Sequence, residues 1–425
     1  MEIRKITAAE RSQILDGYDY AFYEWQEDLL PNPVEPASLA IVEPDEILAA
    51  IIDNKIGASL RVHDFHQSIR GEVRPIGGIG GVWVYPEHRN RGVVRRLLQV
   101  AFAQMHRAGQ VASMLIPFKP SFYGKFGYVV TNANLEVTLP IAAFLPYLEQ
   151  GKKLEQSGNP NDLENLEHNW QWQRVKASES WPEFLDFMIK VAPKQHHGLI
   201  IPSEMPAPQW RSRLQKRQCI LIRHAGELVA AAHYEINSDF RATNEQRLIN
   251  IPDLYWSDLA ARDMLFSFIA RHREQVFSVK LNLPLGTNFQ PWFGDVPTPL
   301  QVEISRNPYM VRVIDVVGAI ANLPASMAGK LTIEVSDQFC DWNQGIYQIW
   351  ADQGRLRCDR LAKDIKDIAA ADVIASIEGI SALVYGTLPI KALEHKGWVR
   401  INNPAVRDLI TAWFPAIPLY NTVRF

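Results

Sequence analysis

The segment Val82–Arg96 limits the possible folds of this chain more than any other part of the sequence. It reads VWVYPEHRNRGVVRR, and its first four β-branched and aromatic residues predict a strand. A basic turn follows, then an amphipathic helix that Gly109 ends. The apolar positions of that helix are Val94, Leu97, Leu98, Ala101 and Met105. Ala112–Ile116 predicts a further buried strand, so the order favours two parallel strands joined by a crossover helix.

The basic turn before this helix is a candidate anion site. The first N–H groups of a helix have no intrahelical partner and lie at the positive end of its dipole. Phosphates and pyrophosphates bind at such places. Gly92 would let the backbone approach the anion closely, and Arg89 and Arg91 add positive charge. The alternative is a solvated basic turn before an ordinary surface helix.

The strand–helix–strand pattern occurs a second time, over Ile249–Trp256, Leu259–Arg273 and Phe277–Leu283, which indicates a diverged duplication at the scale of a domain. A chain of 425 residues also exceeds what one hydrophobic core usually organises. Prolines between residues 290 and 308 mark a later boundary. We therefore predict mixed α/β units over 1–150 and 151–300, and an α+β unit over 301–425.

The third unit is predicted to combine antiparallel strands with helices. Lys330–Val335 and Ile346–Ala351 alternate like strands, and helices are expected at Ala371–Ile377 and Ala405–Trp413. An extended tail, ending at Phe425, completes the chain.

Charge and composition exclude several classes of protein. A formal net charge of −3 gives no sign of a nucleic-acid binder. The three cysteines are too few and too far apart for a disulfide scaffold or a cysteine-based zinc site, and no metal is expected. The segment MEIRKITAAERSQ has no apolar signal region, and no apolar run is long enough to cross a bilayer. We expect a cytoplasmic protein without a membrane partner.

Two motifs resemble those of the GNAT superfamily of N-acetyltransferases. Residues 89–94 occupy the acetyl-coenzyme A loop Arg/Gln-x-x-Gly-x-Gly/Ala and depart from it only at Val94. Residues 121–128, SFYGKFGY, look like the F-Y-x-x-F-G-Y signature of these domains. With the chain length and a terminal aromatic residue, they resemble the Eis-like (enhanced intracellular survival) branch, in which a bulky residue at the Val94 position is normal.

The resemblance implies an architecture of three parts. Tandem GNAT domains, each a mixed central sheet flanked by helices, precede a domain similar to the sterol carrier protein fold. The first GNAT domain would be active. The second has no glycine between its strand and helix, and Asp258 would repel a pyrophosphate there, so we expect that copy to be a scaffold.

The resemblance also implies site residues. Acetyl-CoA would be the co-substrate, and a backbone N–H of its strand would stabilise the negative oxygen that develops during transfer. The expected cofactor-binding residues are Val82, Trp83, Val84, Arg89, Asn90, Arg91, Gly92, Val93 and Val94. Tyr123 would be the general acid, with Tyr128 packed under the sheet. The carboxylate of Phe425 would reach into the active site of the first domain, hold the substrate cation and accept its proton. Glu24 and Trp25, with Glu27 and Asp28 nearby, would bind the substrate.

The implied function is transfer of an acetyl group to an amine of a polycationic small molecule, such as an aminoglycoside or a polyamine. A homo-oligomer, a hexamer by resemblance, is expected. Two alternatives stay open. One is acetylation of a lysine of a peptide or protein. The other is a lipid carrier whose tunnel is lined by Val373–Val384 and Leu409–Pro418.

Overall fold

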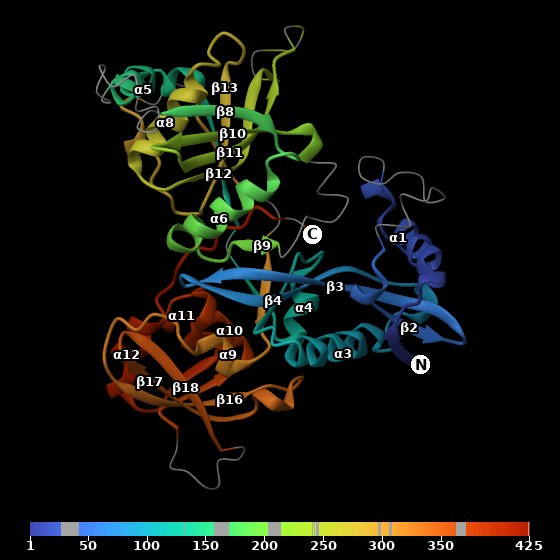
Figure 1. Cartoon of the computed structure of the whole chain (residues 1–425). Coiled ribbons are helices and arrows are strands. Elements are labelled where there is room, and N and C mark those ends of the chain that lie inside the picture. Colours follow the sequence, from blue (N-terminus) through green and yellow to red (C-terminus); the bar gives the residue numbers. More distant parts are fainter. Residues whose placement is uncertain are drawn as a thin grey trace.

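The strands of the chain form three sheets that meet around the C-terminal segment (Figure 1). The structure is a computed structural model, and it describes residues 1–26, 42–131, 133–156, 170–202, 214–239, 241, 243, 246–295, 299–305, 308–362, 371–423 and 425. The side chains of residues 23–26 and 362 lie outside this description. None of the described helices is long and apolar enough to cross a bilayer.

The first sheet carries the strand–helix–strand unit that the sequence predicts. Its order is β1 (Glu2–Lys5), β2 (Ile47–Ile52), β3 (Lys55–Ile69), β4 (Glu72–Val84), β5 (Ala112–Leu115), β15 (Met310–Val313) and β6 (Val129–Val130), and β9 (Ile200–Pro202) adds to β3. β4 and β5 are parallel, as predicted. Asp53 and Asn54 join β2 to β3 with positive φ angles of 50° and 62°, the conformation of a tight hairpin turn.

Helices cover both faces of this sheet. α3 (Val93–Arg107) is the predicted crossover helix, and its buried stripe includes Leu97, Leu98, Ala101 and Met105. α1 (Arg11–Gln26) lies on the other face, where Ile14 and Leu15 pack with Trp83. The loop at the N-terminus of α3 and the α1 face are therefore on opposite sides of β4.

The second sheet repeats the parallel pair. Its order is β14 (Gln301–Ile304), β7 (Leu135–Pro140), β13 (Ser278–Leu283), β12 (Leu248–Trp256), β11 (Glu227–Asn237), β10 (Gln218–His224) and β8 (Gln171–Lys176). β12 and β13 are parallel, and α8 (Leu259–Ala270) connects them. α5 (Pro146–Gln156) and α6 (Trp181–Gln195) flank this sheet (Figure 1).

The two sheets exchange strands, so the division predicted at residue 150 does not coincide with them. β7 lies before that position but pairs with β13 and β14 of the second sheet. β15 lies after residue 300 but pairs with β5 and β6 of the first sheet. Sequence patterning cannot reveal this exchange because a buried strand has the same alternation in either sheet.

The third sheet is built from β18 (Arg355–Ala362), β17 (Gly345–Asp352), β16 (Lys330–Ser336), β19 (Val373–Ser376) and β20 (Val399–Ile401). The described helices of this unit are α9 (Val316–Ile320), α10 (Ile377–Tyr385), α11 (Ile390–His395) and α12 (Arg407–Trp413). The helix predicted over Ala371–Ile377 is wrong. Residues 373–376 form a strand parallel to β16, and the Ser376 side chain then caps α10 by accepting a hydrogen bond from Gly379 N. The buried pairing of Val373 and Ala375 outweighs the weak local preference.

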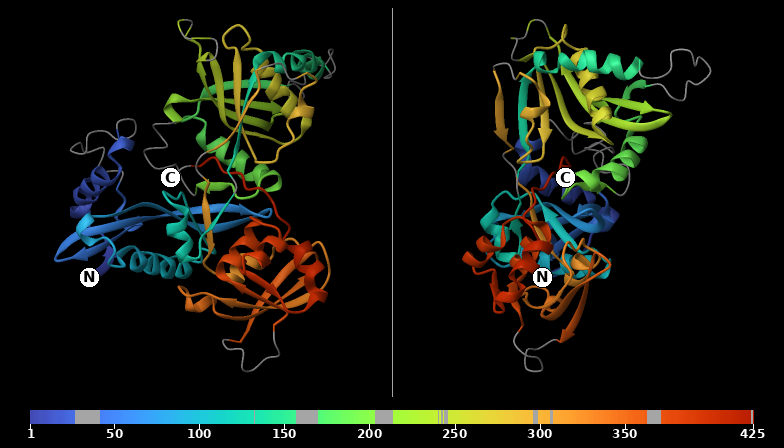
Figure 2. Two further views of the ribbon diagram at one scale, coloured as in Figure 1. Left: turned by 180° about the vertical axis from the view of Figure 1, so that it is seen from behind. Right: turned by 90° about the vertical axis from the view of Figure 1, so that its left-hand side faces the viewer.

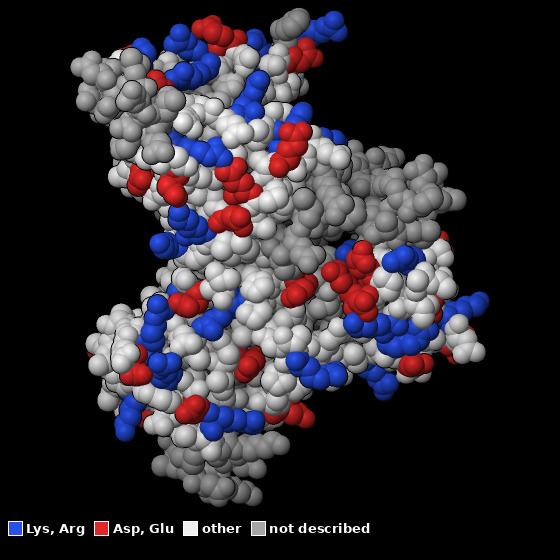
Figure 3. Space-filling view, in the orientation of Figure 1, with Lys and Arg blue, Asp and Glu red and all other residues white. Residues whose placement is uncertain are grey.

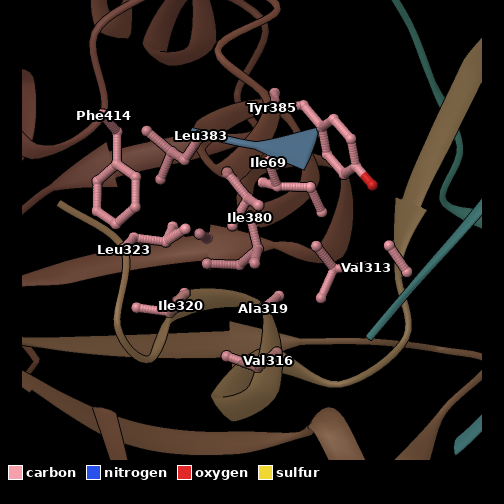
Figure 4. Close-up of a cluster of buried hydrophobic side chains, with 14 of the residues drawn as sticks. Ile69, Val313, Val316, Ala319, Ile320, Leu323, Ile380, Leu383, Tyr385 and Phe414 are labelled. Carbon is pink, nitrogen blue, oxygen red and sulfur yellow. The ribbon is translucent and has the colours of Figure 1, made fainter. Parts of the chain in front are cut away.

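The first and third units share one apolar core (Figure 4). Ile69 of β3 and Val313 of β15 pack against Ile380, Leu383 and Tyr385 of α10. The guanidinium of Arg70, at the tip of the β3–β4 hairpin, donates to the carbonyls of Leu383, Val384 and Pro415 at distances of 2.8 Å. The hairpin therefore satisfies carbonyl groups at the end of α10, and the two units are fixed relative to one another.

His197 connects all three units at this junction, and its burial leads us to predict a loss of stability in acid. Its buried Nδ1 accepts from Arg70 N at 2.9 Å, and its Nε2 lies 2.9 Å from the carbonyl oxygen of Tyr385. Burial lowers the pKa of His197 from 6.5 to about 4. Between pH 6.5 and 4 the unfolded chain thus binds the extra proton and the folded chain does not, so stability falls as the pH drops through this window. A shift of this size corresponds to about 3 kcal/mol.

Thermal unfolding between pH 7 and 4.5 tests this expectation. We expect the acid-induced fall in Tm to be smaller in His197→Gln than in wild type, because the amide does not titrate. His395→Gln, at an exposed position, is the matched control and should follow wild type. An equal fall in Tm for wild type and His197→Gln would contradict the role given to His197.

Candidate active site

The N-terminus of α3 presents backbone donors to open space. Gly92 precedes the helix with φ 76°, and no side chain caps it. A Cβ placed on Gly92 would meet no atom within 4 Å. Arg89, Asn90 and Arg91 are exposed, and Arg89 Nε donates to Val84 O at 3.1 Å, which fixes the turn to the end of β4. This arrangement suits an anionic group such as a pyrophosphate.

The strand next to this turn has free backbone groups on one edge. β4 pairs with β5 only from Ile76 to Ile79, although β4 continues to Val84. On its other edge β4 stays paired with β3 through Trp83 and Val84. Among the described strands, the edge of β4 that faces β5 therefore has no partner beyond Ile79. This open edge lies beside the N-terminus of α3. Val82 and Val84 pack toward the α3 core, whereas Trp83 is buried on the α1 side.

A β-bulge distorts β4 in the middle of this open edge. The register shifts between Ser59 and Arg61 of β3, opposite Gly81, whose φ angle is 54°. Gly81 ends a glycine-dense segment, residues 77–81, and glycine within a strand is typical of a bulge or a close backbone approach. An ideal Cβ on Gly81 would lie 2.6 Å from the hydroxyl oxygen of Tyr18 on α1. Glycine is required here because any side chain would displace that hydroxyl.

Replacement of Gly81 by alanine should therefore lower the stability of the fold by more than the strain of its φ angle alone would. Gly81→Ala adds both left-handed strain, about 1–2 kcal/mol, and the clash with Tyr18. Gly109→Ala is the matched control, since Gly109 has φ 74° and open space where its Cβ would stand. We expect the larger fall in Tm for Gly81→Ala, together with a loss of any activity that depends on the bulge. Equal falls in the two variants would contradict the close approach of Tyr18.

Tyr123 lies at the end of the short helix α4 (Pro120–Tyr123), which follows β5. Its ring packs against Phe118, Phe122 and Tyr128, and burial raises the pKa of Tyr123 to about 12. Its hydroxyl has no hydrogen bond within the described part of the chain. Tyr128 differs, because its hydroxyl lies 2.6 Å from Ser113 Oγ in the core. Of the two tyrosines, Tyr123 has the hydroxyl available for chemistry, and Tyr128 packs under the sheet as expected.

The C-terminal tail runs between the three sheets and is held by buried polar contacts (Figure 2). Tyr420 N donates to His197 O at 2.7 Å, and Tyr420 Oη donates to Asn282 O of β13 at 3.0 Å. Asn421 O accepts from Asn134 Nδ2 at 2.7 Å, and Val423 O accepts from Tyr309 Oη at 2.5 Å. Elements of the second unit thus help to direct the last residues toward the first sheet.

The last residue lies on the first sheet. The ring of Phe425 is 5.1 Å from that of Phe65 and 5.5 Å from that of His63, both on β3. One edge of the Phe425 ring would be 3.0 Å from a Cβ on Gly78 and 3.8 Å from a Cβ on Gly80. The missing side chains of these glycines therefore leave the space that the terminal ring fills. This places Phe425 on β4 just before the bulge.

A polar cluster that sequence reasoning missed includes His63, which contacts the terminal ring. Arg61 Nε donates to Glu46 Oε2 at 2.6 Å, and the same oxygen lies 3.7 Å from His63 Nδ1. Burial lowers the pKa of His63 well below 6.5, and the charge of Arg61 adds to this effect. Tyr18, whose hydroxyl is buried without a hydrogen bond, has a pKa raised to about 12 by burial. The available signal was the alternation of Arg61, His63 and Phe65 on one face of β3.

The expected substrate residues are only partly described. Glu24 and Trp25 belong to the last turn of α1, and their side chains lie outside the described part of the chain. Glu27 and Asp28 lie outside the described residues altogether.

The corresponding turn of the second unit is closed to an anion. Asp258 caps α8, with its Oδ1 accepting from Ala261 N at 2.9 Å. A carboxylate therefore stands at the helix end that is uncapped in the first unit. The two helix N-termini therefore differ, because an exposed basic turn precedes α3 and a carboxylate caps α8.

The segments proposed to line a lipid tunnel pack into a core instead. The apolar side chains of α10 are buried in the cluster shared with the first unit, together with Leu409, Ile410, Trp413 and Phe414 (Figure 4). An open pocket of about 490 Å³ lies on the outer surface of β16 and β17, lined by Gly329, Lys330, Gln348, Trp350 and Ala351. Its lining is distinct from the two proposed segments. In the described residues, no group of three His, Cys, Asp or Glu side chains is arranged to hold a metal ion.

Comparison with known families divides the chain into three matches. Residues 2–131 match an acetyltransferase (GNAT) domain, and residues 204–313 match a second acetyltransferase (GNAT) domain. Residues 316–420 match a sterol carrier protein domain. The second match includes β15, which completes the first sheet.

Related sequences and solved structures match this chain over most of its length. Uncharacterized N-acetyltransferases from Streptomyces avermitilis and Streptomyces coelicolor are each 22% identical, over 365 and 351 residues. These matches cover 81% and 79% of this chain, and 80% and 78% of the relatives. A GCN5-related N-acetyltransferase from Anabaena variabilis has a TM-score of 0.78 at 16% identity, and Eis1 from Mycobacterium abscessus one of 0.76 at 17%, each covering 100% of both chains. The structures therefore share the fold of the whole chain.

Proposed function

The chain is an acetyltransferase with two GNAT domains followed by a sterol carrier protein domain, and from this premise we propose that it acetylates an amine of a polycationic small molecule, an aminoglycoside-like compound or a polyamine. GNAT domains use acetyl-CoA as co-substrate. The observation that carries the proposal is the position of Phe425, which brings the end of the third domain onto β4 of the first domain.

The co-substrate is proposed to bind along the open edge of β4. Its pyrophosphate suits the uncapped N-terminus of α3, with Gly92 allowing close approach and Arg89 and Arg91 adding charge. The unpaired backbone groups from Val82 to Val84 would hold the adjoining chain by hydrogen bonds. When bound, acetyl-CoA supplies a thioester whose acetyl group an amine attacks. A backbone N–H at the bulge would stabilise the negative charge that develops on the acetyl oxygen.

Tyr123 is proposed as the general acid. The departing thiolate needs a proton, and a thiol has a pKa of about 8.5, below that of a tyrosine near 10. Because burial raises the pKa of Tyr123 to about 12, its hydroxyl stays protonated over the whole range in which the enzyme would work. Tyr123 follows β5, the strand that pairs with β4 up to Ile79, which supports this proposal. The raised pKa also makes the hydroxyl a weaker acid, so donation would need direct contact between the hydroxyl and the departing thiolate.

The carboxylate of Phe425 is proposed to hold the ammonium group of the substrate. A terminal carboxylate has a pKa of about 3.5, so it is negatively charged at neutral pH and attracts a cation. Its ring anchors it against Phe65 and His63, and the contacts of Tyr420, Asn421 and Val423 fix the preceding chain. Because the tail is already ordered, less conformational entropy is lost when its carboxylate binds the substrate than would be lost from a free tail.

Acidic and aromatic residues near α1 support a cationic substrate. Asp16 and Glu87 raise the pKa of Tyr85 in addition to its burial, which indicates a negative potential at the end of β4. The rings of Tyr20 and Trp83 lie 5.5 and 4.9 Å from that of Tyr85. Figure 3 shows a group of acidic side chains on the first domain near β3. Acidic and aromatic groups together suit a compound with several ammonium groups.

The proposal is tested by thiol release from acetyl-CoA against aminoglycosides, polyamines and lysine peptides, with mass detection of the products. We expect thiol release with small polycations and a matching acetyl mass gain. Release with lysine peptides alone would favour acetylation of a peptide or protein. Cofactor binding without release for any amine would contradict the proposed substrate class.

A further inference from the structure

A buried ion pair joins the first sheet to the sterol carrier protein domain. The side chains of Arg312 on β15 and Asp337, which follows β16, are fully buried, and Arg312 Nη2 donates to the two Asp337 oxygens at 2.7 and 2.9 Å. The same carboxylate accepts hydrogen bonds from Phe339 N, Cys340 N and Asn343 Nδ2. Because the loss of hydration of two buried charges offsets much of their attraction, such a pair indicates a fixed arrangement more than added stability.

Arg312 also holds the segment that carries Tyr123. Its Nε donates to the carbonyl oxygen of Phe126, three residues after Tyr123, at 2.7 Å. Its guanidinium lies 4.5 Å from the centre of the Phe102 ring on α3. Gly127 leaves the space for this contact, because a Cβ there would be 3.0 Å from Arg312 Nε. One guanidinium therefore joins the sterol carrier protein domain to the backbone just after Tyr123.

Aromatic contacts run from the same loop of the sterol carrier protein domain to Tyr123. The ring of Phe339 lies 5.3 Å from that of Phe126. The ring of Phe122 then lies 5.6 Å from that of Phe126 and 5.1 Å from that of Tyr123. α4 has four residues and the 3-10 turn Gly124–Phe126 has three, so neither is stable by itself. Contacts from outside the segment therefore set the position of the Tyr123 ring.

We propose that Arg312 and Asp337 position Tyr123 for proton donation, so that the sterol carrier protein domain controls the acid as well as the terminal carboxylate. The inference rests on the proposed function and adds two positioning residues to it. Arg312 contacts α3 at Phe102, in the second half of the helix, whereas the basic turn precedes the first residue of the helix. Loss of the Arg312 contacts should therefore displace Tyr123 and leave the basic turn in place. A displacement of about 1 Å at a reacting group can lower the rate by ~10²-fold.

Arg312→Lys in two backgrounds tests the inference. Lysine keeps a positive charge opposite Asp337, but its one ammonium group cannot occupy the places of both Nε and Nη2. We expect acetyl transfer to kanamycin or spermidine, measured in a single turnover, to slow by ~10–10²-fold in the otherwise wild-type chain. In a Tyr123→Phe background the same substitution should slow transfer by less than ~2-fold, because the hydroxyl that it positions is already absent. The dissociation constant of acetyl-CoA should be unchanged in both backgrounds.

Arg70→Lys is the matched control, with the same exchange of side chain at the same junction. Arg70 is buried and donates to carbonyl groups at the end of α10 and at Pro415, and none of these belongs to the Tyr123 segment. Both lysine variants should have a lower Tm than wild type. At a temperature at which both are folded, we expect the wild-type rate in Arg70→Lys only. An equal loss of rate in the two variants would assign the effect to the junction in general and overturn the role of Arg312.

Phe339→Leu is a second variant on the same path, and it decides the question if Arg312→Lys does not fold. It leaves the ion pair intact and removes the ring edge that contacts Phe126. We expect a smaller loss of rate than in Arg312→Lys, and this loss should also disappear in the Tyr123→Phe background. Losses that multiply with the loss caused by Tyr123→Phe would overturn the inference.

Failure of the inference differs from failure of the proposed function. Multiplying losses, in a protein that acetylates amines and is slowed by Tyr123→Phe, would remove the positioning role and leave both the acid and the acetyl transfer intact. A Tyr123→Phe variant as fast as wild type would remove the acid and the positioning role together, and leave acetyl transfer intact. Wild type that binds acetyl-CoA but acetylates neither amine would contradict the proposed function and the inference.

Discussion

Moving the terminal carboxylate should lower turnover by ~10²–10⁴-fold, the range for loss of a group that handles a proton or charge at the reacting centre. Two variants move it in opposite ways. Deletion of Phe425 removes the ring that packs on Phe65 and His63, and extension by Gly-Ser keeps the ring but displaces the charge. Both leave the contacts of Tyr420, Asn421 and Val423 in place, so the fold and the Tm should be retained.

Phe425→Leu is the matched control, since it keeps the terminal carboxylate and an apolar anchor. We expect it to retain most of the turnover, and we expect cofactor affinity to be unchanged in all three variants. Turnover near that of wild type in both the deletion and the extension would remove the carboxylate from the mechanism. Equal losses in Phe425→Leu and in the extension would assign the effect to the ring instead.

Tyr123→Phe should lower turnover by ~10²–10³-fold with little change in cofactor affinity. The substitution removes one hydroxyl and keeps the ring contacts with Phe118, Phe122 and Tyr128. Because the pKa of Tyr123 is raised to about 12, the loss should be the same from pH 6 to 9. Steady-state turnover at several pH values, with cofactor binding by calorimetry, measures both quantities.

Tyr128→Phe separates acid catalysis from packing. It removes a hydroxyl that is hydrogen-bonded to Ser113 in the core, so it should lower stability by about 1 kcal/mol and leave turnover intact. If Tyr123→Phe turns over like wild type, Tyr123 is not the acid. If both variants lose the same turnover, the effect arises from the shared aromatic packing.

Sequence patterning predicted the elements of the chain better than their partners. The crossover helix α3, the parallel pair β4 and β5 and the equivalent pair β12 and β13 follow from local apolar periodicity, and all are confirmed. The two GNAT domains and the sterol carrier protein domain are confirmed as well. The exchange of β7 and β15 between the sheets was missed, because pairing depends on distant strands and not on the local pattern.

The basic turn of the candidate site could also be predicted, because residues 89–94 are contiguous and their chemistry is local. The polar residues near Phe425, on the α1 side of the sheet, could not. Glu46, Arg61 and His63 come from β3 and the turn before β2, and Tyr18 comes from α1. Each is an ordinary polar residue in the sequence. Only the packing of α1 on the sheet, with Gly81 leaving space for Tyr18, brings them together.

The sequence by itself determined the basic turn before α3, the aromatic motif around Tyr123 and the order of the three units, since each depends on residues close together in the chain. Only the tertiary structure decided where Phe425 lies and what surrounds it. Its position depends on Asn134, Asn282 and Tyr309 holding the tail and on Gly78 and Gly80 leaving room for the ring. These contacts join residues more than a hundred positions apart, and no local preference of the chain encodes them.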